Sequence, residues 1–425
     1  MSTIYTTLVP FVPMSLKRND RDSAPKLRCE CGPRCTSEQA AEPGEKTDMQ
    51  PEREISPVFV VGTGRCGSTM LSNMLRMHPD VLSLSEFMVA IADFGGRISQ
   101  AFPGTPITAE ELWAVLGGCH PRQTTMVRHG CEVEEMIYPF GTGSRFDRST
   151  GVPAVMFAAL PHLTKNPDAL FEELQRFVMT LDAAMPSTQY QRVFEWVRRR
   201  LGKRVWVERS GGSLRATARL AQSFPAARFI HIVRDGRDCA MSMSRHLAFR
   251  LHAATAIQSA MLGCDPFECA DRRGAWMLPG TLRKLLPEHF DAETLRTLHL
   301  PPALFGCHWS VEIRRGEAAL AALPRERVLT VHFEDLLQEP ELWLRRMIEF
   351  IHPSLVNEQW MRDAASLAGS PRSSWRNLPA VERALLQWSC IPGQRALARM
   401  GHRRQPDPVS RTAREFTPKS VRSVA

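Results

Sequence analysis

Residues 58–69 read Val58-Phe59-Val60-Val61-Gly62-Thr63-Gly64-Arg65-Cys66-Gly67-Ser68-Thr69. The four apolar residues at the start are typical of a strand buried in a parallel sheet. The glycine-rich stretch predicts a tight loop, and the helical spacing of apolar residues from 69 to 75 predicts a helix after it. The backbone N–H groups of such a loop and the helix dipole can together hold a phosphate group. We therefore predict an anion-binding loop at residues 62–69, with an ordinary glycine-rich turn as the alternative.

The loop differs from the nucleotide-triphosphate loop, which reads Gly-x-x-x-x-Gly-Lys followed by Ser or Thr. Gly62 and Gly67 have that spacing, but Ser68 stands where the lysine belongs. The cation is Arg65 inside the loop, and its planar guanidinium suits phosphate or sulfate oxygens. The buried strand at 228–233 is followed by Arg234 rather than by a carboxylate that could hold magnesium. The pattern predicts anion binding without a metal, and a nucleotide-triphosphate-dependent kinase of related fold is the second hypothesis.

Short apolar strands alternate with helical segments along the rest of the chain. Strands are expected at 81–84, 205–208, 228–233 and 328–331, and helices at 110–116, 169–180, 189–200, 214–223, 309–323 and 342–351. This alternation predicts an α/β fold with a parallel sheet flanked by helices on both faces. The expected domains are a flexible leader at 1–55, one domain at 56–402 and a basic tail at 403–425. Within that domain, helical inserts at 93–204 and 246–306 are expected to cap the site.

A second anion site is predicted where the strand at 228–233 ends. Arg234 follows this strand, at the edge of the sheet where α/β folds bind ligands. Ser242 lies in the early turns of the next helix, so both side chains can reach one anion. Arg237 and Asp238 between them are interpreted as an ion pair at the start of that helix.

In these features the chain resembles the 3′-phosphoadenosine-5′-phosphosulfate (PAPS)-dependent sulfotransferases, a P-loop-related family. The resemblance implies that the loop at 62–69 binds the 5′-phosphosulfate and that Arg234 and Ser242 bind the 3′-phosphate. Arg65, in place of a lysine, favours the bacterial and tyrosylprotein-type branches. Arg209 stands where the family often has a lysine that contacts the transferring sulfate, which implies a catalytic role for it. Two later segments also resemble the family: Val331-His332-Phe333-Glu334-Asp335-Leu336 and Trp375-Arg376.

A general base is predicted at Glu86. The strand at 81–84 runs parallel to the loop strand, so Glu86 follows it at the ligand-binding edge of the sheet. A hydroxyl is a poor nucleophile at neutral pH, and a positioned base activates it. The tyrosylprotein-type sulfotransferases that the chain resembles carry a catalytic Glu after a stretch similar to His78-Pro79-Asp80-Val81. A surface or helix-capping Glu86 is the alternative, and His129 and His308 are rival bases.

These motifs predict a sulfotransferase that uses PAPS and a small-molecule, glycan or lipid acceptor, with a non-catalytic nucleotide-binding module as the third hypothesis. The 425 residues carry a net charge of +9, but much of the excess lies in the tails, so we expect no nucleic-acid partner. No apolar run reaches the roughly 18 residues of a membrane span, and the opening stretch is a poor signal peptide, so a cytoplasmic location is expected. No metal is expected, because the anion sites lack a carboxylate placed to hold magnesium. A metal site at Cys29, Cys31 and Cys35 is the alternative, although their spacing is not a standard zinc pattern. The acceptor and the oligomeric state stay open.

Overall fold

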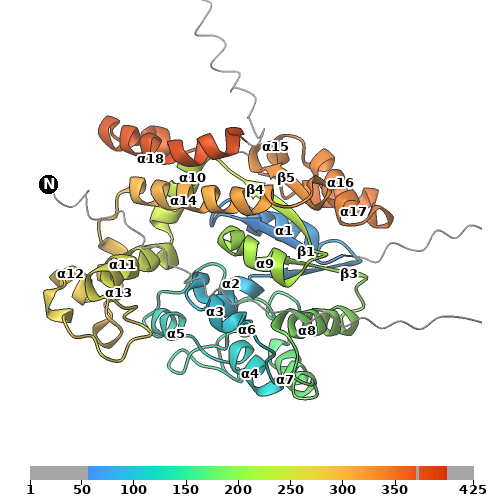
Figure 1. Ribbon diagram of the computed structural model, residues 1–425, viewed down its shortest axis with the longest axis horizontal. Helices are drawn as coiled ribbons and strands as arrows, with labels where there is room; N and C mark the ends of the chain where they lie inside the picture. Colours follow the sequence, from blue (N-terminus) through green and yellow to red (C-terminus); the bar gives the residue numbers. More distant parts are fainter. Residues whose placement is uncertain (1–55, 370–372, 400–425) are drawn as a thin grey trace, which may run out of the picture. The chain divides into compact units, whose positions relative to one another are not determined.

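The computed structural model of the chain describes residues 56–369 and 373–399. A parallel five-stranded sheet, in the order β2-β3-β1-β4-β5, forms its centre (Figure 1). The strands are β1 (Val58–Gly62), β2 (Val81–Ser85), β3 (Val205–Arg209), β4 (Arg228–Val233) and β5 (Val328–His332). The predicted leader at 1–55, the basic tail at 403–425 and the cysteines Cys29, Cys31 and Cys35 lie outside the described residues.

Helices make up most of the remaining described structure. The α-helices are α1 (Ser68–Arg76), α2 (Phe87–Ala92), α3 (Ile98–Ala101), α4 (Ala109–Leu116), α5 (Pro121–Arg128), α6 (Ala154–Phe157), α7 (Pro167–Val178), α8 (Pro186–Arg200), α9 (Thr217–Ser223), α10 (Gly236–Arg245), α11 (Leu247–Leu262), α12 (Gly280–Arg283), α13 (Ala292–Thr297), α14 (Pro302–Ala321), α15 (Phe333–Gln338), α16 (Pro340–Ile351), α17 (Glu358–Ala365) and α18 (Ala380–Arg399). Short 3-10 helices span Asp93–Gly95, Ser213–Ala216, Ala275–Met277, Pro287–His289, Arg325–Arg327, Pro353–Leu355 and Trp375–Asn377.

Several helices begin earlier than their apolar spacing predicts. The helices expected from 169, 189, 309 and 342 start instead at Pro167, Pro186, Pro302 and Pro340. Proline is favoured in the first helical turn, because its fixed φ suits the helix and its missing N–H would have had no partner there. The prolines, rather than the apolar residues, therefore mark where these helices start.

Helices cover both faces of the sheet, as predicted. On one face α1 joins β1 to β2, and α17 packs against α1. On the other face α14 contacts α9, α10 and α18. The connection from β1 to β2 crosses the sheet in one direction, and the connections from β3 to β4 and from β4 to β5 cross it in the other. Because such crossovers are almost always right-handed, their helices lie on opposite faces of the sheet. Every residue of β1 is buried, which explains its continuous apolar sequence. The α/β fold with a parallel sheet flanked by helices is thus confirmed.

The strand order brings the ends of four strands to one edge of the sheet. Because the strands are parallel, the loop after β1, Glu86 after β2, Arg209 at the end of β3 and Arg234 after β4 all lie at this edge. The connection from β2 to β3 carries α2 to α8, and the connection from β4 to β5 carries α10 to α14 (Figure 1). A second apolar core around Leu251, Leu285 and Leu295 holds the segment from α11 to α13 together.

Candidate functional site

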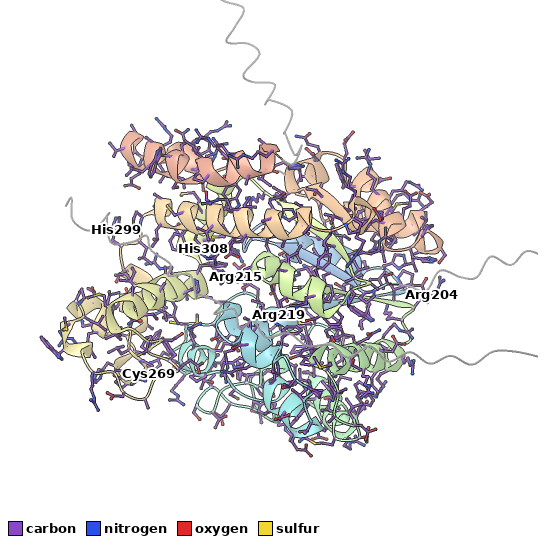
Figure 2. All side chains as sticks on the ribbon, in the orientation of Figure 1. Arg204, Arg215, Arg219, Cys269, His299 and His308 are labelled. Carbon is purple, nitrogen blue, oxygen red and sulfur yellow. The ribbon has the colours of Figure 1, made fainter. Side chains whose placement is uncertain are left out.

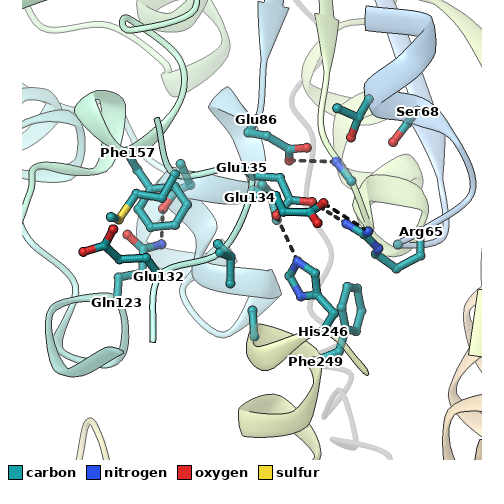
Figure 3. A pocket seen from close by; sticks show the side chains of 18 of the residues that line it. Arg65, Ser68, Glu86, Gln123, Glu132, Glu134, Glu135, Phe157, His246 and Phe249 are labelled. Atoms are coloured by element: carbon teal, nitrogen blue, oxygen red, sulfur yellow. Dashed lines mark hydrogen bonds and ion pairs between the residues drawn. The ribbon is translucent and has the colours of Figure 1, made fainter. Parts of the chain in front are cut away.

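A pocket of about 230 Å³ lies at this edge of the sheet (Figure 3). Of the predicted site residues, the following line it: Gly64, Arg65, Gly67, Ser68, Thr69, Glu86, Arg209, Arg234 and Ser242. Residues between 123 and 136, and His246, Ala248 and Phe249, supply further walls. The pocket therefore brings together the loop, Glu86, Arg209 and Arg234, which the strand-edge argument places at this edge. It also takes walls from segments that this argument does not predict, including residues between 123 and 136.

The loop after β1 is packed tightly between two aromatic rings. A Cβ atom on Gly64 would lie 1.9 Å from Cζ of Phe249, and one on Gly67 would lie 2.1 Å from Cδ2 of Phe333. Gly67 also has a φ of 93°, which other residues rarely adopt. Because Gly67 offers no side chain to cap α1, the first N–H groups of that helix are available to an anion.

Three other predicted loop residues, Gly62, Thr63 and Cys66, are buried and do not line the pocket. The Thr63 hydroxyl donates to Sγ of Cys239 at 4.0 Å, so it faces α10 rather than the pocket. The Cys66 thiol is fully buried, and this burial raises its pKa. Their side chains therefore shape the loop from inside, and only their backbone could contact a ligand.

Arg65 connects the loop to two other parts of the site. Its Nε donates to Oγ of Ser242 on α10 at 3.1 Å, and its Nη1 donates to Oε1 of Glu135 at 2.6 Å. Glu135 also accepts from Nε2 of His246 at 2.9 Å. Burial alone would raise the pKa of the Glu135 carboxyl, but His246 and Arg65 lower it to about 2. Glu135 is thus a charged partner that holds the guanidinium of Arg65 toward the pocket.

Arg234, which directly follows β4, contacts the same loop. Its Nη1 donates to the carbonyl oxygen of Arg65 at 3.1 Å, and its guanidinium lies 4.8 Å from the centre of the Phe333 ring. A second pocket of about 320 Å³ adjoins this arginine. Its lining residues are Arg65, Glu134, Arg234, Asp238, Ser242, Arg245, His246 and Ser374. The two pockets are adjacent, because they share five lining residues: Arg65, Glu134, Arg234, Ser242 and His246.

Glu86 and Arg209 form a buried ion pair in the wall of the first pocket. Nη1 of Arg209 donates to Oε1 of Glu86, and their side chains are 1% and 6% exposed. Oε2 of Glu86 accepts from the N–H of Gly211 at 2.9 Å. Burial raises the pKa of the Glu86 carboxyl, and Arg209 opposes that rise. A carboxylate held in this way, with a raised pKa, is suited to accept a proton.

Backbone strain is concentrated at the pocket. In the described part of the chain, three residues other than glycine have a positive φ, and two of them, Arg65 (61°) and Glu86 (56°), line this pocket. Left-handed backbone at such residues is unfavourable and occurs preferentially at functional sites. The strain therefore lies at two of the residues that the sequence predicts to be catalytic, Arg65 and Glu86.

The rival bases lie elsewhere. His129 is exposed and packs against the ring of Phe290, and it does not line the pocket. His308 lies beside Arg215, whose Nη2 is 3.4 Å from its Nε2, and burial lowers the pKa of His308 to about 3 (Figure 2). The histidines that do line the pocket are His162 and His246.

Sequence reasoning missed Glu135 and His246. A run of acidic residues, Glu132-Val133-Glu134-Glu135, was the available signal in the first insert. The interpretation of Arg237 and Asp238 as an ion pair is wrong, because Arg237 bonds to Asp235 instead, with Nε 2.9 Å from Oδ1. Asp235 is the N-cap residue of α10, and its carboxylate also accepts the backbone N–H of Arg237.

Metal-ligating side chains do not cluster in the described structure. Within residues 56–369 and 373–399, no group of three or more His, Cys, Asp and Glu residues is placed to hold a metal ion. Over the same residues, no helix combines the length and apolar character that crossing a membrane requires.

The chain is similar to known sulfotransferases in sequence and in structure. A family model described as the sulfotransferase family matches residues 57–115 and 145–273. No curated protein is significantly similar to the chain in sequence. The solved structures that resemble it include the sulfotransferase domain of the Synechococcus PCC 7002 olefin synthase, with 14% identity, a TM-score of 0.39, and coverage of 84% of this chain and 98% of that one. A sulfotransferase from Alicyclobacillus acidocaldarius gives 16% identity, a TM-score of 0.36, and coverage of 82% and 97%.

Proposed function

The chain belongs to the sulfotransferase family, and we propose that it transfers a sulfuryl group from PAPS to a hydroxyl or amine of a small-molecule, glycan or lipid acceptor. The observation that carries this proposal is the contact between the two predicted anion sites. Nε of Arg65 lies 3.1 Å from Oγ of Ser242, and both residues line the pocket that also holds Glu86. One donor with anionic groups at both ends could therefore span the two sites beside a base.

The charges of the two pockets support this placement of the donor. The start of α1 and Arg65 would hold the 5′-phosphosulfate, because helix N-termini and guanidinium groups both favour such anions. Arg234 and Ser242 would bind the 3′-phosphate in the second pocket. The guanidinium groups of Arg65, Arg234 and Arg245 line this pocket and outnumber its two carboxylates, Glu134 and Asp238. The phosphosulfate would replace Glu135 as the partner of Arg65.

The proposed transfer moves one proton and one sulfuryl group. The acceptor hydroxyl gives its proton to the Glu86 carboxylate while its oxygen forms a bond to the donor sulfur. The bond from sulfur to the bridging phosphate oxygen breaks, and that oxygen keeps the electron pair in adenosine 3′,5′-bisphosphate. Arg65 would stabilise the charge that develops on the leaving group. Arg209 holds Glu86 in place and lines the pocket, which supports its predicted contact with the transferring sulfate.

The kinase hypothesis is not favoured. The chain belongs to a different family, and Ser68 at the start of α1 stands where a nucleotide-triphosphate loop has its lysine. The bacterial and tyrosylprotein-type branches and the cytoplasmic location stay predictions from the sequence.

Titration calorimetry with adenosine 3′,5′-bisphosphate in excess chelator tests the proposal. We expect binding under these conditions, and transfer of labelled sulfate from PAPS when a panel of phenols, sugars and lipids is supplied. Tighter binding of a nucleoside triphosphate with magnesium would favour the kinase. Binding of the bisphosphate without transfer to any acceptor would favour the non-catalytic module.

A further inference from the structure

Two cysteines flank a single helical turn in the second insert, outside the lining of both pockets. Cys264 and Cys269 lie in the connection from α11 to α12 (Figure 2), and both are half-buried. The N–H groups of Glu268 and Cys269 donate to the carbonyl oxygen of Asp265 at 3.1 and 2.9 Å. Oδ1 of Asp265 accepts the N–H of Phe267 at 2.9 Å and so caps the turn. Cys264 is therefore the residue before the cap, and Cys269 is the fourth residue after it.

This spacing brings the two thiols together. At a capped helix start, the side chain before the cap often packs against the side chain four positions after the cap. A hydrogen bond with the Cys269 side chain raises the pKa of Cys264, which agrees with a contact between the two sulfur atoms. Both thiols are reached by solvent, and an accessible cysteine beside a second one is the arrangement typical of reversible oxidation.

The turn between the two cysteines contacts the first insert. Oδ2 of Asp265 accepts from Nη2 of Arg122 at 2.5 Å, and the guanidinium of Arg122 lies 5.6 Å from the centre of the Phe267 ring. Nη1 of Arg122 also donates to Oδ2 of Asp93 at 3.1 Å, and both of these side chains are buried. Arg122 belongs to α5, which supplies part of the pocket wall. A change in the turn would therefore act on a helix that borders the site.

We propose that Cys264 and Cys269 form a thiol–disulfide exchange site that reacts with low-molecular-weight disulfides such as oxidised glutathione. The thiolate of one cysteine attacks a sulfur of the oxidant, and the first glutathione leaves as a thiolate with the electron pair. The second cysteine then loses its proton and attacks the protein sulfur of the mixed disulfide, which releases the second glutathione. The two cysteines are oxidised to one disulfide, and the oxidant is reduced to two thiols that take up the two protons.

The disulfide would close the turn around Asp265. A cross-link stabilises a structure mainly by restricting its opened state, so the contact between Asp265 and Arg122 would open less often in the oxidised protein. This inference goes beyond the proposed sulfuryl transfer and does not depend on it.

Mass spectrometry after incubation with oxidised glutathione at about pH 8, where more of each thiol is ionised, tests the exchange. The tryptic peptide 251–272 contains both cysteines and no other cysteine. In wild type, we expect this peptide to lose two hydrogen atoms and to resist alkylation until it is reduced. Cys264→Ser should stop at a mixed disulfide of glutathione with Cys269. Cys307→Ser, a change at an exposed cysteine on α14, should leave the reaction unchanged. A wild-type peptide that stays unmodified, or that carries glutathione on both cysteines, would overturn the proposal.

Hydrogen exchange tests the effect on the pocket wall. We expect amide exchange in α5, residues 121–128, to slow by about tenfold when wild type is oxidised, because the turn opens less often. The double variant Cys264→Ser/Cys269→Ser should show no such change with the oxidant. Equal exchange in oxidised and reduced wild type would overturn the proposed effect on α5. Because neither measurement uses turnover or a nucleotide, a protein that forms this disulfide but transfers no sulfate would contradict the proposed function alone.

Discussion

Glu86, which follows β2, pairs with Arg209 at the end of β3, although 123 positions separate them along the chain. The pair exists because β2 and β3 are neighbours in the sheet, with Ser85 opposite Arg209. The guanidinium fixes one carboxylate oxygen, and the N–H of Gly211 fixes the other. The proposed base is thus held in one orientation at the pocket, so the entropy cost of orienting it is not part of the barrier to reaction.

Replacing Glu86 by Gln is expected to lower turnover at least about a hundredfold, because the variant keeps the shape but cannot accept a proton. The affinity for adenosine 3′,5′-bisphosphate, measured by calorimetry, should be nearly unchanged. Wild-type turnover should also fall as the pH drops through the pKa of Glu86, which burial raises above the ordinary value for Glu. Near-normal turnover of Glu86→Gln would assign the base role to His246, His162 or solvent.

Replacing Arg234 by Ala is expected to weaken binding of the bisphosphate by roughly tenfold to a hundredfold, because a charge-assisted hydrogen bond is lost. Arg234 also donates to the backbone of Arg65, so part of the loss would come from a less ordered loop. Ser242→Ala separates the two effects, because Ser242 does not touch the loop backbone in the described hydrogen bonds. Equal affinities of wild type and both variants would show that the 3′-phosphate does not bind at this site.

The sequence predicts those parts of the site that directly follow a recognisable strand. In a parallel sheet the carboxyl ends of the strands lie at one edge, where ligands bind. The loop at 62–69, Glu86 and Arg234 each follow a recognisable buried strand, and the structure places them at one edge. Glu135 and His246 escaped prediction, because Glu135 contacts Arg65 from 70 positions away and His246 contacts Glu135 from 111 positions away. No local sequence pattern fixes the path of the segments that carry them. His129 and His308 illustrate the same limit, since residue type alone does not place a side chain in a pocket.

Replacing Arg65 by Ala is expected to lower kcat more than it weakens binding of the donor product. Negative charge shifts onto the leaving phosphate during transfer, so a fixed guanidinium stabilises the transition state more than the ground state. Binding should change less, because in the free protein Arg65 already has a carboxylate partner in Glu135 that the nucleotide must replace. Steady-state kinetics and calorimetry on the same variant check this. A change confined to the KM for the donor would make Arg65 a binding residue.

Glu208 gives a prediction about stability rather than catalysis. This residue of β3 is fully buried, and its Oε1 accepts from Oγ of Ser210 at 2.5 Å and from the N–H of Met88 at 3.0 Å. Its Oε2 has no hydrogen-bond partner among the described residues. Burial raises the pKa of Glu208 to about 7, whereas an unfolded Glu titrates near about 4.3. The folded protein therefore binds more protons than the unfolded chain between these two values, and the free energy of unfolding falls as the pH rises through that window.

Glu208→Gln keeps the acceptor oxygen but removes this titration. Relative to wild type, the free energy of unfolding of the variant is expected to increase between pH 5 and pH 8 by roughly 2–3 kcal/mol. The stabilisation that wild type has at low pH is complete below the unfolded pKa and is lost as the pH rises through the folded pKa. Urea unfolding of both proteins at the two pH values measures the difference. Glu341→Gln, an exposed change on α16, is the control and should show no such trend. A constant difference between wild type and Glu208→Gln at both pH values would mean that Glu208 ionises in the folded protein as readily as in the unfolded chain.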